Sequence, residues 1–491
     1  MTVLVVGSAA AQMRLYELKY LLFLPLGRQD GLETIPALAQ SWEHSPDYRA
    51  WTIHLRDDVR WHDGVPVTAH DVAFSLELFR HPDVIFPAGG WGLDSAVVLD
   101  EHAITLFVTQ PTHYPPLGGW AVYFPRHLLH DLDPADFYEW EFWNRPVGNG
   151  PYRLVRHIPQ TMLEFEANHD FYGGEPPINN VVAKLSSANP VIELTSGAAD
   201  AATNLKPADL LNLEADPRFV TYYQNDWTEL YLVYWNHRHP LFTDARVRRA
   251  LNHAVDRREL ARVLNLPEEI PLMGGLGNDG GLDPHRRRAW DRTPAYDPER
   301  AERLLDQAGW IDRDGDGTRE RDGREARFTL LAPQAGSLAA VAQGLFIQDQ
   351  LRRVGVEVEV RPMEIPVVRE ALRSGEFEAA IIWENQDPHT ILWTWFGGPA
   401  DPGDRTGDEP VRFGYDDPEV ARLLELVLAT PDPEAQDTLY TRINETLRRD
   451  MPVMLLFPGV YRYVAHRRIR GFRQGWGWLD HSEELWIEDE P

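Results

Sequence analysis

Carboxylates at alternate positions make residues 312–320 the clearest pattern for metal chemistry in this chain. The loop reads DRDGDGTRE, with acids at its positions 1, 3, 5 and 9 and a glycine at position 6. This order opens a calcium-binding loop, which normally ends on a bidentate glutamate at position 12. Gly323 stands at that position and removes two ligand oxygens. We therefore expect no cofactor and an acidic turn that closes a hairpin, with calcium on Asp312, Asp314 and Asp316 as the alternative.

A second pattern is the histidine pair His237 and His239, which follows the apolar run Leu230–Trp235. Two histidines at alternate positions of a strand would face the same side and could chelate a metal. The stretch that joins Trp235 to Pro240 is better explained as a polar loop, so we predict no metal site there.

The richest segment is Trp383–Trp395, which reads WENQDPHTILWTW. It follows the predicted strand Glu378–Trp383, and open α/β sheets bind ligands beyond the carboxyl ends of their parallel strands. Its carboxylates suit a cationic ligand, and its indole rings suit stacking on sugars or apolar groups. Trp393 and Trp395 could equally pack inside the helix that follows.

The sequence lacks the patterns that usually indicate an enzyme. We find no nucleophile elbow, phosphate-binding loop, zinc-protease helix or dinucleotide fingerprint. The absence of cysteine excludes disulfides, thiolate metal sites and cysteine nucleophiles. We therefore expect a protein that is not an enzyme.

Composition narrows the class of partner. A chain of 491 residues is too long for one ordinary core, so two or three domains are expected. With 76 acidic and 48 basic residues the formal net charge is −28, which repels nucleic acid and anionic lipid surfaces. No apolar run approaches the roughly 20 residues of a membrane-spanning helix. Residues 1–11 lack the basic start and long apolar core of a signal peptide, so we predict a buried strand there.

Strands and helices alternate along the second half of the chain, which predicts an α/β fold with a doubly wound parallel sheet. Aspartate, proline and glycine punctuate the helix predicted at 297–309, and Thr68 with Asp71 forms a capping-box start for another. Further strands are predicted at 51–55, 104–108, 152–157, 162–167, 181–185, 230–235, 328–332, 356–362, 378–383 and 453–457, and further helices at 247–260, 338–354, 366–374 and 418–450.

Six blocks of sequence are rich in helix caps, turns and strand ends. They are Ile35–Trp42, Trp51–Ser75, Gly148–Leu154, Glu166–Gly174, Asp244–Leu251 and Asp297–Gly309. Together, and in this order, they resemble the signature of the family 5 extracellular solute-binding proteins, the dipeptide-, oligopeptide-, nickel- and oligosaccharide-binding components of ABC importers. The blocks identify the family but do not locate its ligand, because such residues mostly specify the fold.

The resemblance implies a two-lobed, periplasmic-binding-protein-like α/β fold with an extra small subdomain and a hinge between the lobes. Lobe one would comprise residues 1–41, 146–242 and 455–491, with the subdomain at 42–145 inserted into it and lobe two at 243–454. The chain would cross between lobes near 235–244 and near 457–470, with the ligand held between the lobes.

The resemblance also implies what is bound and where. The protein would be a monomeric receptor outside the cytoplasm that delivers an oligopeptide to the transmembrane permease subunits of an ABC importer. It would be membrane-associated through that transporter, and we expect any signal sequence to be absent from this chain. In peptide-binding relatives an acidic residue captures the α-ammonium of the peptide. Alignment from Asp387 and Pro388 puts it at Glu384, and alignment from Trp383 puts it at Gln386.

The predicted ligand-binding residues combine this segment with the first crossing between lobes. They are Trp383, Glu384, Asn385, Asp387, Trp393, Trp395, Trp235 and Asn236. The 17 tryptophans keep oligosaccharide binding by indole stacking as the alternative. A hydrolase acting in the cleft is the remaining alternative, and it would require a nucleophile–base pair that we do not find.

Overall fold

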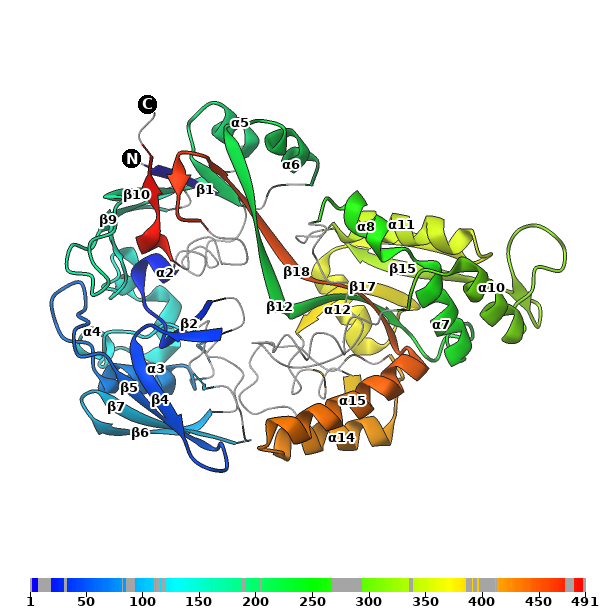
Figure 1. Ribbon diagram of the computed structural model, residues 1–491, viewed down its shortest axis with the longest axis horizontal. Coiled ribbons are helices and arrows are strands. Elements are labelled where there is room, and N and C mark those ends of the chain that lie inside the picture. The colour runs from blue at the N-terminus through cyan, green and yellow to red at the C-terminus, as the bar shows by residue number, and fades with distance from the viewer. Residues whose placement is uncertain are drawn as a thin grey trace. The chain divides into compact units, whose positions relative to one another are not determined.

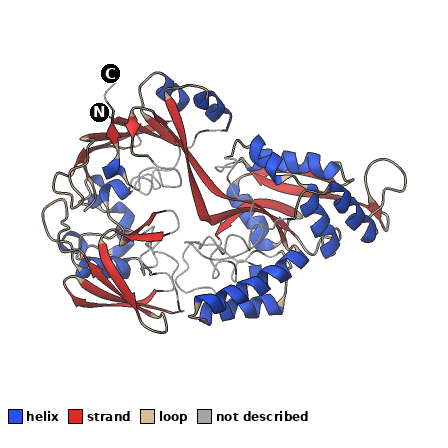
Figure 2. Cartoon of the chain, in the orientation of Figure 1, coloured by secondary structure: helices blue, strands red, loops and turns tan. Residues whose placement is uncertain are grey.

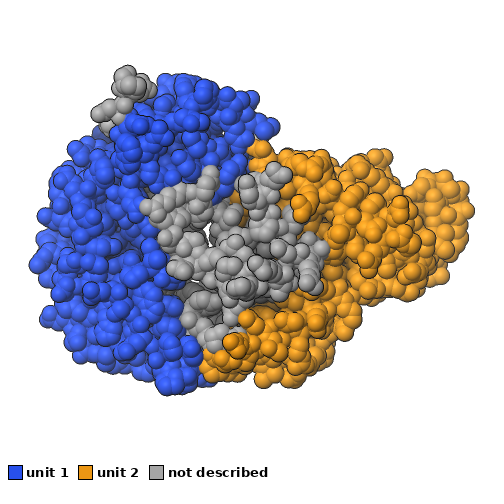
Figure 3. All heavy atoms as spheres, in the orientation of Figure 1, with its two compact units in different colours: residues 1–224, 401–407, 461–491 blue, residues 225–400, 408–460 orange. Residues whose placement is uncertain are grey.

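The computed structural model divides the chain into two compact units, drawn in different colours in Figure 3. Unit 1 contains residues 1–224 and 461–491, and unit 2 contains residues 225–400 and 408–460. The structure describes residues 2–7, 19–30, 33–81, 83–84, 93–109, 111, 115–116, 121–159, 161–186, 190–203, 205, 207–266, 294–334, 339–385, 391, 395–396, 411, 413–472 and 481–488.

Two long strands contribute residues to both units. They are β12 (Phe219–Trp235) and β18 (Val453–His466), labelled in Figure 1. The chain passes into unit 2 between Gln224 and Asn225, inside β12 and earlier than the crossing expected from the sequence. The lobe boundaries given above stay a prediction.

Unit 1 carries one side of a mixed sheet. Its strand order is β18-β11-β1-β10-β9-β8, parallel between β1 and its two neighbours and antiparallel elsewhere. The strands are β1 (Thr2–Gly7), β8 (Tyr152–Ile158), β9 (Met162–Ala167), β10 (Asn180–Ser186) and β11 (Ala201–Thr203). The helices α5 (Pro190–Thr195) and α6 (Pro207–Glu214) form a small separate core with β11.

A second, antiparallel sheet of unit 1 has the order β4-β5-β7-β6. One continuous hydrophobic core joins this sheet to strands β8, β9 and β10, so the inserted segment packs on the rest of unit 1. The elements here are α2 (Lys19–Leu22), β2 (Gly27–Asp30), β3 (Glu33–Pro36), β4 (Ala39–His44), β5 (Ala50–Leu55), α3 (Ala69–Leu78), β6 (Leu93–Asp100), β7 (Ala103–Val108), α4 (Arg126–Leu129), η1 (Pro134–Glu139), η2 (Glu141–Asn144), β19 (Ile469–Arg470), η3 (Ser482–Glu484) and β20 (Trp486–Ile487).

Unit 2 is built on strands in the order β16-β15-β17-β12-β18. Helices α12, α14 and α15 bury one apolar face of this sheet, and Figure 2 shows α14 and α15 running side by side. The elements are α7 (Ala245–Ala254), α8 (Arg257–Val263), α10 (Pro298–Gln307), β13 (Glu320–Arg321), β14 (Arg324–Glu325), β15 (Arg327–Pro333), α11 (Ala340–Arg352), β16 (Glu357–Met363), α12 (Ile365–Ser374), β17 (Ala379–Asn385), α14 (Pro418–Ala429) and α15 (Pro433–Asp450).

The predicted parallel sheet is only partly correct. Strand β15 is parallel to both β16 and β17, as the alternation of strands and helices indicated. Strand β12 is instead antiparallel to β17, which makes the sheet of unit 2 mixed. Strand β12 enters unit 2 from unit 1. No local pattern of residues predicts the direction in which it pairs with β17.

Local helix signals were reliable, except where two helices were taken as one. The Asp71 carboxylate accepts the backbone N–H of Thr68 (2.8 Å), as the capping box requires. The run expected at 247–260 is broken because Asp256 caps a new helix through the N–H groups of Arg258 and Glu259. The run expected at 418–450 is broken in the same way, where Asp432 precedes Pro433.

His62 joins two of the sequence blocks that resemble the family. Its Nδ1 accepts the N–H of Gly148 (3.1 Å), so its Nε2 carries the proton and donates to the carbonyl of Gly150 (3.1 Å). A Cβ at Gly148 would lie 1.9 Å from the carbonyl oxygen of Leu22, so only glycine allows this approach. These blocks therefore position backbone in unit 1, as expected of fold-specifying residues.

Burial lowers the pKa of His62 to about 4, which makes unit 1 sensitive to acid. The unfolded chain binds a proton near pH 6.5 but the folded chain does not, so stability present above pH 6.5 is lost as the pH falls toward 4. The shift corresponds to at most about 3 kcal/mol, and partial exposure of the ring reduces this to about 2 kcal/mol.

The variant His62→Gln should therefore show a flatter pH dependence of unfolding between pH 7 and pH 4, measured as urea midpoints. The exposed His130→Gln is the matched control and should follow the wild type. An unchanged pH dependence in His62→Gln would contradict a neutral, buried imidazole.

Candidate functional site

Three of the predicted ligand residues lie in strand β17 and not beyond it. The strand was expected to end at Trp383, but its antiparallel register with β12 continues through Leu230↔Glu384 and Glu229↔Asn385. The prediction failed here because polar residues close the strand, while the pairing that extends it comes from β12. Trp383 and Glu384 are thus held by a sheet, which fixes their backbone more firmly than a loop would.

Glu384 has an unusual environment for a carboxylate. Its side chain is only 5% exposed. It shares a face of β17 with Ala380 and Ile382, which belong to the apolar core beneath α12, α14 and α15. Transfer of a charge into such surroundings is costly unless hydrogen bonds or an opposite charge compensate it. The ionised form of Glu384 is therefore stable only if its neighbours supply hydrogen bonds or a positive charge.

Tyr234, on the neighbouring strand β12, is the first of these neighbours. Its side chain is fully buried, and its hydroxyl oxygen accepts the indole N–H of Trp395 (2.7 Å). Burial raises the pKa of Tyr234 well above its usual value, and the charge of Glu384 and a hydrogen bond to that carboxylate raise it further. The indole N–H and the charge of Arg369 act in the opposite direction. The hydroxyl of Tyr234 is thus kept neutral, and the charge of Glu384 contributes to this.

A positive charge also reaches the end of β17. Arg369, on α12, places its guanidinium carbon 5.7 Å from the ring centroid of Trp383, within the range of a cation–π contact. The ring of Trp383 also packs 6.0 Å from that of Tyr231 on β12. Trp383 is therefore partly buried between a strand and a cation.

Trp395 packs inside unit 2. It is 4% exposed, its ring lies 6.3 Å from the rings of both Tyr234 and Phe413, and its N–H is used by Tyr234. The structure therefore shows the packing contact, and a stacking role toward a ligand stays a prediction. Asp387, Trp393 and the side chain of Asn385 lie outside the described residues.

Trp235 and Asn236 lie at the other end of the β12–β17 ladder from Glu384. Trp235 is fully buried against Phe242 and Phe328, with ring centroids at 5.1 and 5.9 Å. The amide nitrogen of Asn236 donates to the carbonyls of Phe377 (2.7 Å) and Gly375 (3.1 Å). These contacts hold the end of β12 to the connection between α12 and β17, and a ligand-binding role for either residue stays a prediction.

The predicted residues Trp383, Glu384 and Trp395 therefore lie in unit 2 with Tyr234 and Arg369, and their role as a ligand site stays a prediction. Sequence reasoning missed the last two. Tyr234 is hidden in the apolar run LYLVYW, where its hydroxyl was a weak signal that something polar must lie nearby. Arg369 carried no signal, since an arginine on a helix is usually solvated.

The histidine pair lies in a turn after β12, as expected. His237 approaches the carbonyl of Pro452 (3.0 Å) and packs against Phe413 and Tyr415, and burial lowers its pKa to about 4. The ring of His239 is directed elsewhere, with its Nε2 3.9 Å from Glu378. In the described residues the two imidazole rings therefore contact different partners.

The acidic loop folds around its own backbone. The two carboxylate oxygens of Asp312 accept the N–H groups of Gly315 (2.8 Å) and Gly317 (3.1 Å), and Glu320 accepts the N–H of Arg313 (3.0 Å). Ile311 pairs with Glu320, which closes the expected acidic turn before the hairpin β13–β14.

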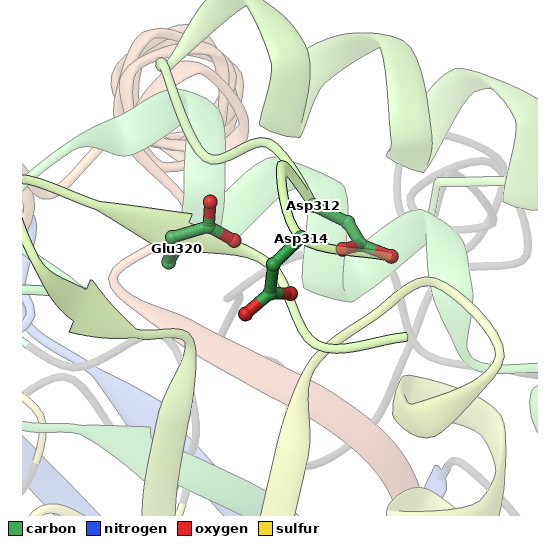
Figure 4. A group of neighbouring side chains, drawn as sticks. All are labelled: Asp312, Asp314 and Glu320. Atoms are coloured by element: carbon green, nitrogen blue, oxygen red, sulfur yellow. The ribbon is translucent and has the colours of Figure 1, made fainter. Parts of the chain in front are cut away.

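Carboxylate oxygens from two parts of this loop also converge. One oxygen from each of Asp312, Asp314 and Glu320 lies within 4.8 Å of the others, and Figure 4 shows the two aspartates on the turn and Glu320 on the following strand. Asp316, the third residue of the calcium alternative, instead caps the N–H of Thr318 (2.7 Å). Exposed acids often cluster without an ion, so this convergence does not establish a metal site. The absence of a cofactor stays a prediction.

Comparison with known proteins identifies the family. The profile described as "Bacterial extracellular solute-binding proteins, family 5 Middle" matches residues 33–403. The chain belongs to this family. The resemblance carried by the six sequence blocks is therefore confirmed.

Individual relatives agree with this assignment. The oligopeptide-binding protein AppA of Bacillus subtilis is 25% identical over 465 residues, which cover 89% of this chain and 80% of AppA. The structure of B. subtilis AppA with a nonapeptide matches with a TM-score of 0.72 at 20% identity, covering 99% of both chains. That of NikZ from Campylobacter jejuni with Ni(L-His) matches with a TM-score of 0.75 at 24% identity, covering 99% of both chains. These structures confirm the periplasmic-binding-protein-like fold.

A search of the described helices finds none that is long and apolar enough to cross a membrane.

The acidic loop should bind calcium no more tightly than about 10⁻⁵ M, because position 12 supplies no carboxylate. Calorimetry on metal-stripped protein measures this directly, with Asp314→Ala as the test variant and Glu325→Gln on the adjoining hairpin as the control. Sub-micromolar calcium binding that disappears in Asp314→Ala alone would contradict the prediction.

Proposed function

We propose that this chain captures an oligopeptide outside the cytoplasm and delivers it to the transmembrane permease subunits of an ABC importer. Membership of a solute-binding family and relatives named as oligopeptide-binding proteins support the role. The observation that carries the choice of ligand is Glu384, a buried carboxylate at the carboxyl end of β17 whose neighbours include a tyrosine hydroxyl.

A peptide offers one group that such a carboxylate suits, its α-ammonium. An ionised carboxylate only accepts hydrogen bonds, so it suits an ammonium group, which only donates them. A buried ammonium must be paired, because an unpaired charge in a dry site is costly. Asp387, three residues further along, is the other candidate for this role.

Oligosaccharide binding is the competing proposal, and it depends on exposed indole faces. Trp395 is buried and its N–H is already used, which weakens its candidacy as a stacking platform. Trp393 therefore carries most of this alternative. We also propose that the protein binds without turnover, because no nucleophile–base pair accompanies the carboxylate in its sequence segment.

Glu384→Gln or Asp387→Asn should weaken binding of a pentapeptide pool at least about tenfold, since truncating one partner of a buried charge pair costs about 2–5 kcal/mol. Calorimetry with the same pool N-acetylated should give weak binding to the wild type. Cello- and manno-oligosaccharides serve as the comparison ligands, with Trp393→Ala and Trp395→Ala as the comparison variants.

The opposite pattern would support the sugar proposal. Heat from the oligosaccharides alone, unaffected by both carboxylate substitutions and abolished by Trp393→Ala, would end the peptide proposal. Hydrolysis of the pool by the purified protein would show instead that the chain is an enzyme.

We further propose a monomer that closes on its ligand. The motivation is that β12 and β18 each contribute residues to both units, so two strands connect bodies with separate cores. Such a connection permits a hinge motion. Small-angle scattering should show a smaller radius of gyration at saturating peptide and a mass of one chain, and an unchanged radius would contradict closure.

A further inference from the structure

One buried arginine joins the chain segments at the unit 2 ends of the two connecting strands. Arg248, on α7, is only 4% exposed. Its Nη1 donates to the carbonyl of Phe242 (2.6 Å), in the segment that follows β12. Its Nε donates to the carbonyls of Asp450 (2.9 Å) and Met451 (3.2 Å), in the turn that precedes β18. One guanidinium therefore bridges the segment after β12 and the turn before β18.

A histidine joins the same two segments independently. The Nε2 of His237 lies 3.0 Å from the carbonyl oxygen of Pro452. A carbonyl only accepts hydrogen bonds, so Nε2 carries the proton and donates it. The backbone N–H of His237 donates to the carbonyl of Phe413 (2.6 Å), and its ring packs against Phe413 and Tyr415. The segment after β12 is therefore bonded to the turn before β18 at two points.

The turn before β18 is strained where these donors reach it. Met451 ends α15 with a φ of 43°, in the left-handed region that few side chains adopt. Such a conformation is unfavourable and persists only where the surrounding structure holds it. The N–H of Met451 donates to the carbonyl of Leu447 (2.7 Å), and its own carbonyl accepts from Arg248. The Asp450 carboxylate accepts the hydroxyl of Tyr415 (3.1 Å), so contacts from outside the turn help to hold it.

The two strands that begin or end here are those that connect the units. Strands β12 and β18 are neighbours in the sheet order, and β12 runs into unit 2 while β18 runs out of it. Hinge motions are absorbed by a few residues in loops or at the ends of elements. The bonds to both segments therefore restrict motion at the unit 2 ends of the two strands.

We propose that Arg248, assisted by His237, is a positioning residue for ligand capture, because it fixes the unit 2 ends of β12 and β18. This inference rests on the proposed function, since it takes the protein to close on its ligand. Neither residue acts by touching the ligand, and both act through the strands. A protein whose unliganded form is already restricted loses less freedom on closing, so it binds more tightly.

Arg257 on α8 offers a matched control. It is 3% exposed, and its Nε donates to the carbonyl of Leu455 (2.7 Å) in β18. Its other hydrogen bonds in the described part of the chain go to Asn252 and to the carbonyl of Val255, both close to it in sequence. Arg257 is thus a buried guanidinium that bonds β18 without bridging to the segment after β12.

The first test uses the protein without ligand. The chain has no cysteine, so Glu77→Cys on α3 and Glu425→Cys on α14, both exposed, place one spin label on each unit. Pulsed electron spin resonance then measures the distribution of distances between the labels. Arg248→Lys keeps the charge but replaces two donating nitrogens by one, so it should broaden this distribution. Arg257→Lys should keep the wild-type width, and His237→Phe, which keeps the ring packing, should broaden it less.

The second test measures apparent affinity for a random pentapeptide pool. It should fall about three- to tenfold in Arg248→Lys and change by less than about twofold in Arg257→Lys. Thermal midpoints should fall in both variants, because each loses buried hydrogen bonds. A purely structural role for Arg248 predicts equal loss of affinity in the two. If Arg248→Lys does not fold, the width and affinity of His237→Phe decide.

The outcomes are separable. A wild type whose label distance shortens with the pool, with Arg248→Lys matching Arg257→Lys in width and affinity, would overturn this inference and leave the proposed function intact. A wild type whose label distance does not change at saturating pool would refute the proposed closure, and the inference would fall with it.

Discussion

The carboxylate of Glu384 is buried at the carboxyl end of β17. Glu384 extends into a face of unit 2 that is otherwise apolar, where a charge without partners would be costly. Its charge helps to raise the pKa of Tyr234, whose hydroxyl accepts the indole N–H of Trp395, and Arg369 lies over the ring of Trp383, the residue before Glu384. Buried polar groups stabilise a fold only when each has a hydrogen-bond partner, so the environments of Trp395, Tyr234 and Glu384 depend on one another.

Strand β12 is the element that makes the arrangement available. It carries Tyr234, pairs with β17 so that Glu384 lies opposite Leu230, and extends from unit 1 into unit 2. The side-chain amide of Asn236 then hydrogen-bonds the end of β12 to the connection that leads into β17. One strand therefore carries Tyr234 and fixes the register of Glu384.

Sequence reasoning succeeded where the signal was local. The caps at Thr68 and Asp297 and the ends of β9 depend on residues within a few positions of one another. It failed for the first part of β12 and the last residues of β17, because their partners are far along the chain. It also missed Tyr234, whose hydrogen-bond donor Trp395 lies 161 residues away. Periodicity predicts which face of a strand is apolar, and it does not predict which buried hydroxyl meets which indole.

Competition between free and blocked amino termini tests whether Glu384 binds the α-ammonium of a peptide. The purified protein would be incubated with an equimolar mixture of pentapeptides and their N-acetyl forms, desalted and denatured, and the released ligands quantified by mass spectrometry. If Glu384 binds this group, nearly all recovered peptide carries a free α-amine, and Glu384→Gln loses this enrichment. Equal recovery of both forms, or recovery unaffected by Glu384→Gln, would contradict it.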